Sequence, residues 1–258
     1  MFSNLSLLIY FIKKDIKSKY AGSILGVLWT VVLPLSQILI FWFVFDEIIR
    51  ARPYAGTTNT HIPYLYFLLS TLLLWSAFAD GITRASTSII EHSDMIKKVS
   101  FPNIYLPISA TIASYVQPVM GFIIFIIVYS ILSTFSPVYF LLIPIIILQM
   151  LLTMGIGMIL AALMPFLRDI TYLIGQGMQG LFFLSPIMYS IDKIPEKFRI
   201  LFFLNPFAHY ASVYHKIVLF RETPATASML TLSAMSIGLL ALGCLIFSKF
   251  KDGFSDVL

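Results

Sequence analysis

The chain has 258 residues, of which 59% are hydrophobic and 11% are charged. Soluble domains carry about 25% charged residues, so this composition excludes an ordinary soluble enzyme and indicates a membrane protein. The net charge of +5 is modest for this length and favours contact with anionic lipid over nucleic acid.

The first 26 residues (1–26) predict a basic amphipathic helix at the membrane surface. Apolar residues recur at helical spacing from Leu5 to Tyr20, while Lys13, Lys14 and Lys17 fall on the opposite side. A helix with this pattern lies in the headgroup plane, where its lysines contact anionic lipid. The alternative interpretation is that the first 12 residues, which are apolar on all sides, form a short span.

Six later stretches are apolar enough to cross the membrane, whose hydrocarbon core of about 30 Å takes about 20 helical residues. The predicted spans are 27–45, 64–79, 104–132, 139–163, 170–191 and 223–248. The fold class is therefore an all-α integral membrane protein with six transmembrane helices, in a single domain that covers residues 1–258.

The orientation of these spans follows from residues 101–167, which contain no Asp, Glu, Lys or Arg. A turn signal from Ser133 to Pro137 divides this stretch into two spans, so both of its ends lie on the same side of the membrane. Lys97 and Lys98 precede it, and basic residues near span ends favour the cytoplasm. We therefore expect a multi-pass protein of the cell inner membrane with both termini in the cytoplasm.

Two charged connections do not fit inside a membrane. Residues 83–100 form the longest inner connection. Residues 192–221 combine dense charge with strongly apolar residues, and Asn205 before Pro206 divides them, because the residue before a proline leaves the helical region. We expect two short amphipathic helices there, re-entrant at the outer surface between spans five and six.

The sequence carries no constellation typical of an enzyme. No zinc-protease spacing of histidines and no phosphate-binding loop of the G-x-x-x-x-G-K-[ST] kind occurs, so we expect no catalytic residue, no metal and no cofactor bound by this chain. The G-x-G-x-x-G pattern at 175–180 lies inside a predicted span and is interpreted as close helix packing through small residues. Asp80 is the only candidate proton site, and its place at the inner end of a span favours a solvated or paired carboxylate.

Several motifs in order along the chain resemble the ABC-2 type permeases that export polysaccharide. They are Lys19–Trp29 with Pro34, Ile96–Pro102 with Pro107, Phe166–Ile170, Leu181–Tyr189 and Leu204–Pro206. The resemblance implies a homodimer that works with two copies of a separate ATPase subunit, which binds the ATP and Mg. It also implies that the dimer encloses a channel for a polyprenyl-linked glycan such as O antigen, capsule or teichoic acid.

Candidate residues for these roles follow from the resemblance and from the charge pattern. ATPase coupling is expected at the charged residues of the inner connections: Arg84, Glu91, Asp94, Lys97, Lys98, Arg168 and Asp169. Entry of the lipid head group is expected at the lysines of the first helix: Lys13, Lys14, Lys17 and Lys19. The outer gate is expected in the segment after span five: Phe198, Phe202, Asn205, Pro206, Tyr210 and Tyr214.

Aromatic residues in the spans are the expected channel lining, because a ring stacks on a sugar face without demanding one hydroxyl pattern. A passing polymer needs such weak, repeated sites, by the logic of conducting pores. The residues are Trp29, Phe41, Trp42, Phe45, Trp75, Tyr172, Phe182, Phe183 and Tyr189. The alternative is that these rings pack against lipid or against other helices.

Two other functions stay open at this point. An ABC-2 type exporter of lipids or drugs would share the fold. An ion-coupled secondary transporter or a channel would show inverted repeats and intramembrane carboxylates, and neither is visible in the sequence.

Overall fold

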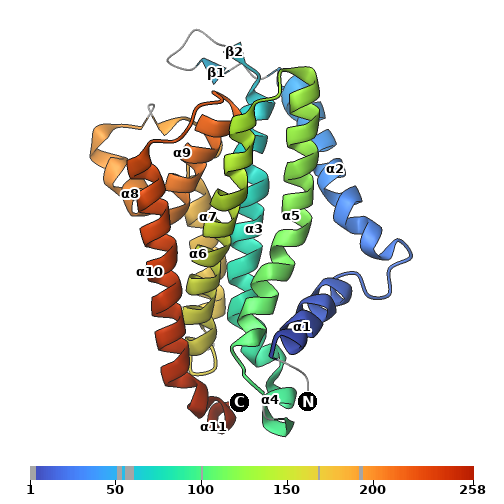
Figure 1. The fold of residues 1–258 in the computed structure, drawn as a ribbon, viewed down its shortest axis with the longest axis vertical. Coiled ribbons are helices and arrows are strands. Elements are labelled where there is room, and N and C mark those ends of the chain that lie inside the picture. Colours follow the sequence, from blue (N-terminus) through green and yellow to red (C-terminus); the bar gives the residue numbers. More distant parts are fainter. Residues whose placement is uncertain (1–3, 51–53, 56–60, 100, 168, 192–193) are drawn as a thin grey trace.

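The computed structural model describes residues 4–50, 54–55, 61–99, 101–167, 169–191 and 194–258. These residues form an elongated bundle of helices (Figure 1). Five helical segments are long and apolar enough to cross a membrane: Trp29–Ile48, Tyr64–Glu91, Tyr105–Leu132, Pro137–Leu163 and Thr226–Gly253. The prediction of an all-α membrane protein is confirmed in this coarser form, with five candidate spans among the described residues.

The first half of the chain runs from a tilted helix at one end of the bundle to the central helix. Its elements are α1 (Asn4–Ser18), η1 (Gly26–Leu28), α2 (Trp29–Trp42), η2 (Phe43–Ile48), β1 (Tyr54–Ala55), β2 (His61–Ile62), α3 (Tyr64–Glu91) and α4 (Ser93–Lys98). β1 and β2 pair antiparallel in a two-residue ladder.

The second half adds the remaining long helices and two short ones. Its elements are α5 (Tyr105–Leu132), η3 (Pro137–Leu141), α6 (Leu142–Leu163), α7 (Ile170–Phe183), η5 (Glu196–Phe198), α8 (Arg199–Leu204), α9 (Pro206–Val218), α10 (Thr226–Phe250), η6 (Lys251–Gly253) and α11 (Phe254–Val257). Figure 1 shows α1, α4 and α11 at one end, here called the terminal end, and β1, β2 and α8 toward the other, the hairpin end.

Helix α3 is the centre of the bundle and packs against α5 and α6, while α6 packs against α10. Small residues allow close approach: a Cβ on Gly155 of α6 would lie 2.5 Å from the carbonyl carbon of Leu239 in α10. Such contacts matter in lipid, because helices in a membrane gain little from the hydrophobic effect and associate through close packing.

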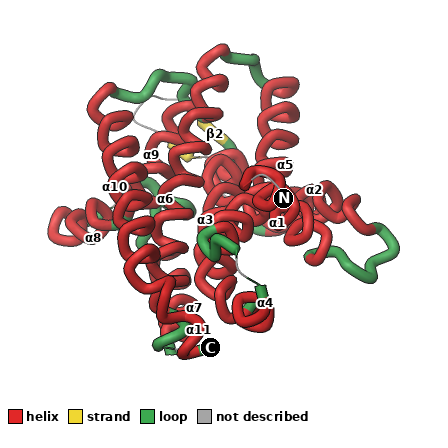
Figure 2. Tube along the Cα trace, turned by 60° about the horizontal axis from the view of Figure 1, so that its bottom comes forward, coloured by secondary structure: helices red, strands yellow, loops and turns green. Residues whose placement is uncertain are grey.

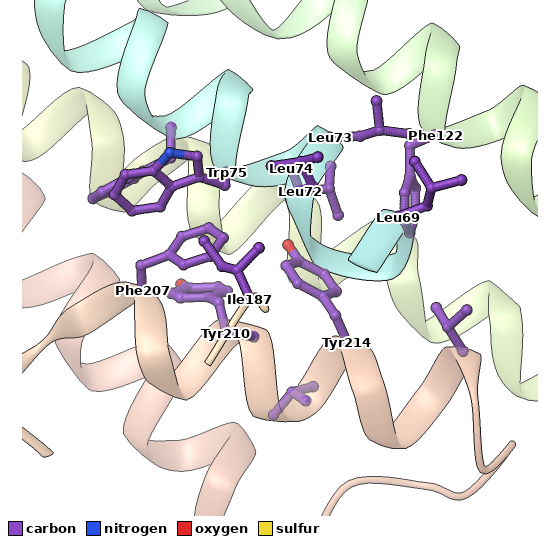
Figure 3. Packing of buried hydrophobic residues seen from close by; sticks show 14 of the residues in the cluster. Leu69, Leu72, Leu73, Leu74, Trp75, Phe122, Ile187, Phe207, Tyr210 and Tyr214 are labelled. Carbon is purple, nitrogen blue, oxygen red and sulfur yellow. The ribbon is translucent and has the colours of Figure 1, made fainter. Parts of the chain in front are cut away.

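The interior between α3, α5 and α9 is filled by large side chains (Figure 3). Trp75 of α3 lies across Phe207 of α9, with ring centroids 4.9 Å apart. Tyr210 and Tyr214, one turn apart on α9, are fully buried beside it. Helix α9 is therefore part of the core of the bundle and not a loosely attached surface helix.

Helix α3 is longer than the predicted span 64–79. It continues without a break to Glu91, so residues 83–91 of the predicted connection are its last turns, and α4 is the one separate helix among the described residues of that connection. The continuation is held by packing, because Ala85, Ser88 and Ile89 are buried. Charged residues within this stretch hid its helical continuity from the sequence pattern.

Helix α7 is shorter than the predicted span 170–191. It ends at Phe183 and is followed by turns through Ser185 and Pro186. Proline has no amide hydrogen and disfavours helix in the preceding residue, which explains the break. Fourteen residues of helix cover only about 21 Å. A sixth span is thus not among the candidate spans of the described residues.

Helix α1 ends at Ser18, earlier than the predicted residue 26. The chain then turns through Gly22, whose φ of +78° is in the left-handed region that glycine tolerates best. Phe11 and Asp15 face the bundle and are buried, while Lys13, Lys14 and Lys17 are exposed. The three lysines are thus exposed as predicted, but the side buried against the bundle is not the predicted apolar stripe, because Leu5 and Ile9 of that stripe are exposed.

Candidate functional site

The segment between α1 and α2 is tied to the bundle by a cluster of polar contacts. Lys19 Nζ lies 3.2 Å from Asp80 Oδ2 of α3, and the Tyr20 hydroxyl donates to Gln117 Oε1 of α5 at 2.9 Å. Asp15 lies one helix turn before Lys19, and its buried carboxylate accepts a hydrogen bond from Ser109 of α5 at 2.7 Å. Asp80 is therefore paired, as its position at the inner end of the predicted span suggested, although sequence gave no sign of its partner.

Tyr20 lies between charges of opposite sign. Burial is the largest effect and raises the pKa of its hydroxyl, Arg84 opposes this shift, and Asp80 adds to it. Arg84 and Asp80 of α3 therefore both act on Tyr20, the side chain that joins the segment between α1 and α2 to α5.

The described residues that were predicted to couple to an ATPase lie on α3, on α4 and just before α7. Arg84 and Glu91 belong to α3, and Glu91 accepts a hydrogen bond from Thr87 at 2.6 Å. Asp94, Lys97 and Lys98 are exposed on α4. Asp169 is exposed just before α7, whereas Arg168 lies outside the described residues.

The chain's last residues complete the surface around α4. Lys97, Lys98 and Phe101 line a groove of about 400 Å³ together with Lys251 and Asp252, which follow α10. Phe254 of α11 is fully buried and packs against Phe247, with ring centroids 5.4 Å apart. Sequence reasoning placed no function on this C-terminal segment, and only its mix of lysine, aspartate and phenylalanine could have suggested one.

The predicted lining residues fall into three classes of exposure. Trp42, Tyr172 and Phe183 are exposed, on α2 and α7. Those of intermediate exposure are Trp29, Phe41, Phe45, Phe182 and Tyr189. Trp75 is 7% exposed and packs inside the protomer between Phe78, Phe182 and Phe207.

The exposed rings lie on α2 and α7, which bury few residues within the chain: Thr30 and Pro34 on α2, and Ile174 on α7. The glycines of the G-x-G-x-x-G pattern are on α7, and no atom of another described element lies within 4 Å of a Cβ placed on Gly175, Gly177 or Gly180. The packing expected of this pattern is therefore not found inside the protomer. Figure 2 shows α2 projecting from one side of the bundle and α8 from the opposite side.

Asn205 joins the predicted outer-gate residues into one structure. Its side-chain oxygen accepts from the backbone amide of Phe207 at 3.0 Å, which caps α9, and Pro206 takes the first helical position. Its amide nitrogen donates to Leu184 O at 3.0 Å and to Ser185 Oγ at 2.8 Å. Asn205 thereby fixes the end of α7 to the start of α9.

The other predicted gate residues divide between the surface and the core. Phe198 is exposed and Phe202 is buried against Tyr189. The Tyr210 hydroxyl lies 2.6 Å from Ser236 Oγ of α10. These contacts attach the segment to the bundle from both sides.

A buried hydrogen-bond network that sequence reasoning missed centres on Gln149 of α6. Its amide nitrogen donates to Leu74 O of α3 at 2.9 Å and to the Tyr115 hydroxyl of α5 at 3.1 Å, and its oxygen accepts from the Tyr214 hydroxyl of α9 at 2.6 Å. One amide thus joins four helices. The available signal was a glutamine inside a charge-free span, because polar side chains there pair across helices.

Comparison with known proteins identifies a matching family and several similar proteins. The model of the family described as "ABC-2 type transporter" matches residues 6–219. Two proteins of Klebsiella pneumoniae, each named "O-antigen export system permease protein RfbA", are 30% identical to this chain over 98% of its length and 95% of theirs. A protein of the same name from Myxococcus xanthus is 25% identical over 97% of this chain and 94% of its own length.

Proposed function

The chain belongs to the ABC-2 type transporter family, and from this premise we propose that it is the membrane-spanning permease subunit of an ATP-driven polysaccharide exporter. Its substrate in this proposal is a polyprenyl-linked glycan of the O-antigen type, moved across the inner membrane. The observation that carries the proposal is the match over nearly the whole chain to relatives named as O-antigen export permeases. The five long apolar helices fit such a multi-pass transport component.

The terminal end of the bundle is proposed to face the cytoplasm. It carries α4 with Asp94, Lys97 and Lys98, and the exposed lysines of α1. Basic residues beside spans favour that side of the membrane. In this orientation α4 faces a separate ATPase subunit, two copies of which hold ATP and Mg, while this chain itself binds no cofactor and catalyses no reaction.

The channel is proposed to form between two copies of the chain, along α2 and α7. Their exposed aromatic residues, Trp42, Tyr172 and Phe183, are available to such a path. Trp75 lies behind Phe182 in the interior, so it supports the wall and does not face the glycan.

The membrane topology completes this proposal. Helix α1 lies in the inner headgroup layer, with Lys13, Lys14 and Lys17 toward anionic lipid and the incoming head group. Helix α7 with the residues up to 191 forms the sixth crossing, and α8 and α9 form the re-entrant outer gate. Asn205 supports the last assignment, because it joins α7 to α9 at the hairpin end.

The proposal is tested in cells that lack this permease and then receive it on a plasmid. Cells without it should retain lipid-linked polymer inside, and complemented cells should display the polymer at the surface. In the same cells, with Cys244→Ser as background, Trp42→Cys should react with a water-soluble thiol reagent and be protected when polymer is trapped. Trp75→Cys is the matched control and should stay unlabelled because the side chain is buried.

Two results would contradict the proposal. Surface polymer that is unchanged without the permease excludes glycan export and favours an exporter of lipids or drugs. Labelling of Trp42→Cys by lipid-soluble reagents alone would place α2 against the bilayer and exclude the proposed path.

A further inference from the structure

The polar cluster between α1 and α2 contains an excess of positive charge that the structure does not neutralise. The Lys19 cluster is defined here as Lys19, Tyr20, Asp80, Arg84 and Gln117. It holds two cations, Lys19 and Arg84, against one carboxylate, Asp80. Asp80 is paired with Lys19, and the Arg84 guanidinium forms no hydrogen bond or ion pair with any residue that the structure describes.

The cluster is preorganised by contacts that do not involve its free charge. Tyr20 is held by Gln117 at 2.9 Å, and burial of Asp15 with its bond from Ser109 fixes the preceding turn of α1. Asp80 and Arg84 are one turn apart on α3, the most buried of the candidate spans. Lys19 and Arg84 are thus presented from two elements toward the same place.

The depth of the cluster matches the phosphate layer of a membrane. Asp80 lies about 24 Å along α3 from Tyr64, at a rise of about 1.5 Å per residue. With Tyr64, the first residue of α3, placed at one edge of a hydrocarbon core about 30 Å thick, Arg84 lies at the other edge, about 30 Å along the helix. Lipid phosphates lie immediately beyond that edge, whereas Lys97 and Lys98 on α4 are further along the axis.

We propose that Lys19 and Arg84 form a binding site for the phosphate group of a membrane lipid, and that Asp80 holds Lys19 until this phosphate replaces it. The exchange is easy because the Lys19–Asp80 pair is partly exposed, with side-chain exposures of 29% and 37%, and exposed ion pairs are weak. A phosphate accepts charge-assisted hydrogen bonds from both cations at once, whereas Asp80 engages only Lys19.

The identity of the lipid rests on the proposed function. If the chain exports a lipid-linked glycan, the ligand is the diphosphate of its polyprenyl carrier. An ordinary anionic phospholipid offers the same chemistry with a single phosphate, and the experiment separates these sources by comparing both probes.

The test measures binding to the full-length permease in phosphatidylcholine nanodiscs, without transport. The probe is polyprenyl diphosphate, with the phosphate-free polyprenol as blank and phosphatidylglycerol as the second ligand. Lys19→Gln and Arg84→Gln should each weaken diphosphate binding about tenfold, since hydrogen bonds to charged groups are the strong ones. Asp80→Asn should strengthen it about threefold, because Lys19 is then free.

A matched control removes a lysine that is exposed at the same end of the bundle. Lys249 on α10 is exposed and lies outside the cluster, so Lys249→Gln should leave binding unchanged. Lys19→Arg, which keeps the charge, should bind within about twofold of the native chain. If Lys19→Gln does not fold, Arg84→Gln alone tests the loss of a cation.

The proposal predicts opposite effects on diphosphate binding: Lys19→Gln weakens it and Asp80→Asn strengthens it. If Asp80→Asn weakens binding as much as Lys19→Gln does, the pair is only a structural link and the proposal is wrong. Equal binding of polyprenol and polyprenyl diphosphate would also overturn it. Because no step of the assay depends on export, a failure of the proposed function leaves these results intact.

Discussion

Helices α3 and α2 are both candidate membrane spans, but they differ in how far the rest of the chain buries them. In the apolar window of α3 72% of the residues are buried within the chain, against 6% in the segment Trp29–Ile48. Helix α3 is joined to its neighbours by buried hydrogen bonds and by glycine contacts, such as Gly81 against Thr153 of α6. Helix α2 enters the bundle mainly where Pro34 meets Gly121 of α5.

This difference shows that apolarity alone does not attach a helix in a membrane. Lipid solvates an apolar helix as well as another helix does, so association depends on close packing and on polar pairs. The packed group α3, α5, α6, α9 and α10 has both, while α2 and α7 have few of either. Three pairs of matched substitutions, each with one member in the packed group, test this distinction.

The largest expected effect compares two tryptophans. Trp75→Ala empties a site between Phe182 and Phe207 and should lower the free energy of unfolding by about 3 kcal/mol, the lower end for buried aromatic truncations. Trp42→Ala, at 44% exposure on α2, should cost less than about 0.5 kcal/mol. Thermal melting of the purified protein in detergent measures both, and equal losses would show that α2 is also packed in the protomer.

The second pair compares two glycines in helices. Gly155→Ala would place a methyl group 2.5 Å from Leu239 backbone atoms and force α6 and α10 apart, at a cost of about 2 kcal/mol. Gly175→Ala on α7 meets no atom within 4 Å and should be neutral, or stabilising by about 0.5 kcal/mol through helix propensity. Melting temperatures decide this pair, and a destabilised Gly175→Ala would mean that α7 has a close partner.

The smallest expected difference compares two glutamines. Gln149→Leu removes the amide that joins four helices and leaves the Tyr214 hydroxyl without its acceptor. Hydrogen bonds between membrane helices are weak on average, so we expect a loss of about 1 kcal/mol. Gln179→Leu, exposed on α7, should change the free energy of unfolding by less than about 0.3 kcal/mol. No difference between the two would show that the network does not hold α9 in place.

The sequence predicted features that depend on local pattern. The basic face of α1 and the break before Pro206 follow from residue spacing and from backbone geometry, and both are present. The end of α7 was readable from Pro186, but the absence of charge up to Ile191 suggested a longer helix.

Contacts between distant residues could not be predicted in this way. Lys19 and Asp80 are 61 positions apart, and Gln149 and Tyr214 are 65 apart. Their pairing depends on how the helices pack, which hydropathy does not encode. The same limit applies to Trp75, whose aromatic character suggested a channel wall while its neighbours place it in the interior.

The unbroken length of α3 has a mechanical consequence. The helix contains no proline, unlike α2 with Pro34 and α5 with Pro118, and sharp kinks occur mostly at such residues. Its rise per residue is fixed, so an axial shift of about 1 Å at Glu91, just before α4, reaches Tyr64, about 40 Å away, almost undiminished. Tyr64 donates a hydrogen bond to Met188 O at 3.0 Å, in the segment between α7 and α8. Work done on the terminal end therefore arrives at the hairpin end as translation in the same direction, with little loss to bending.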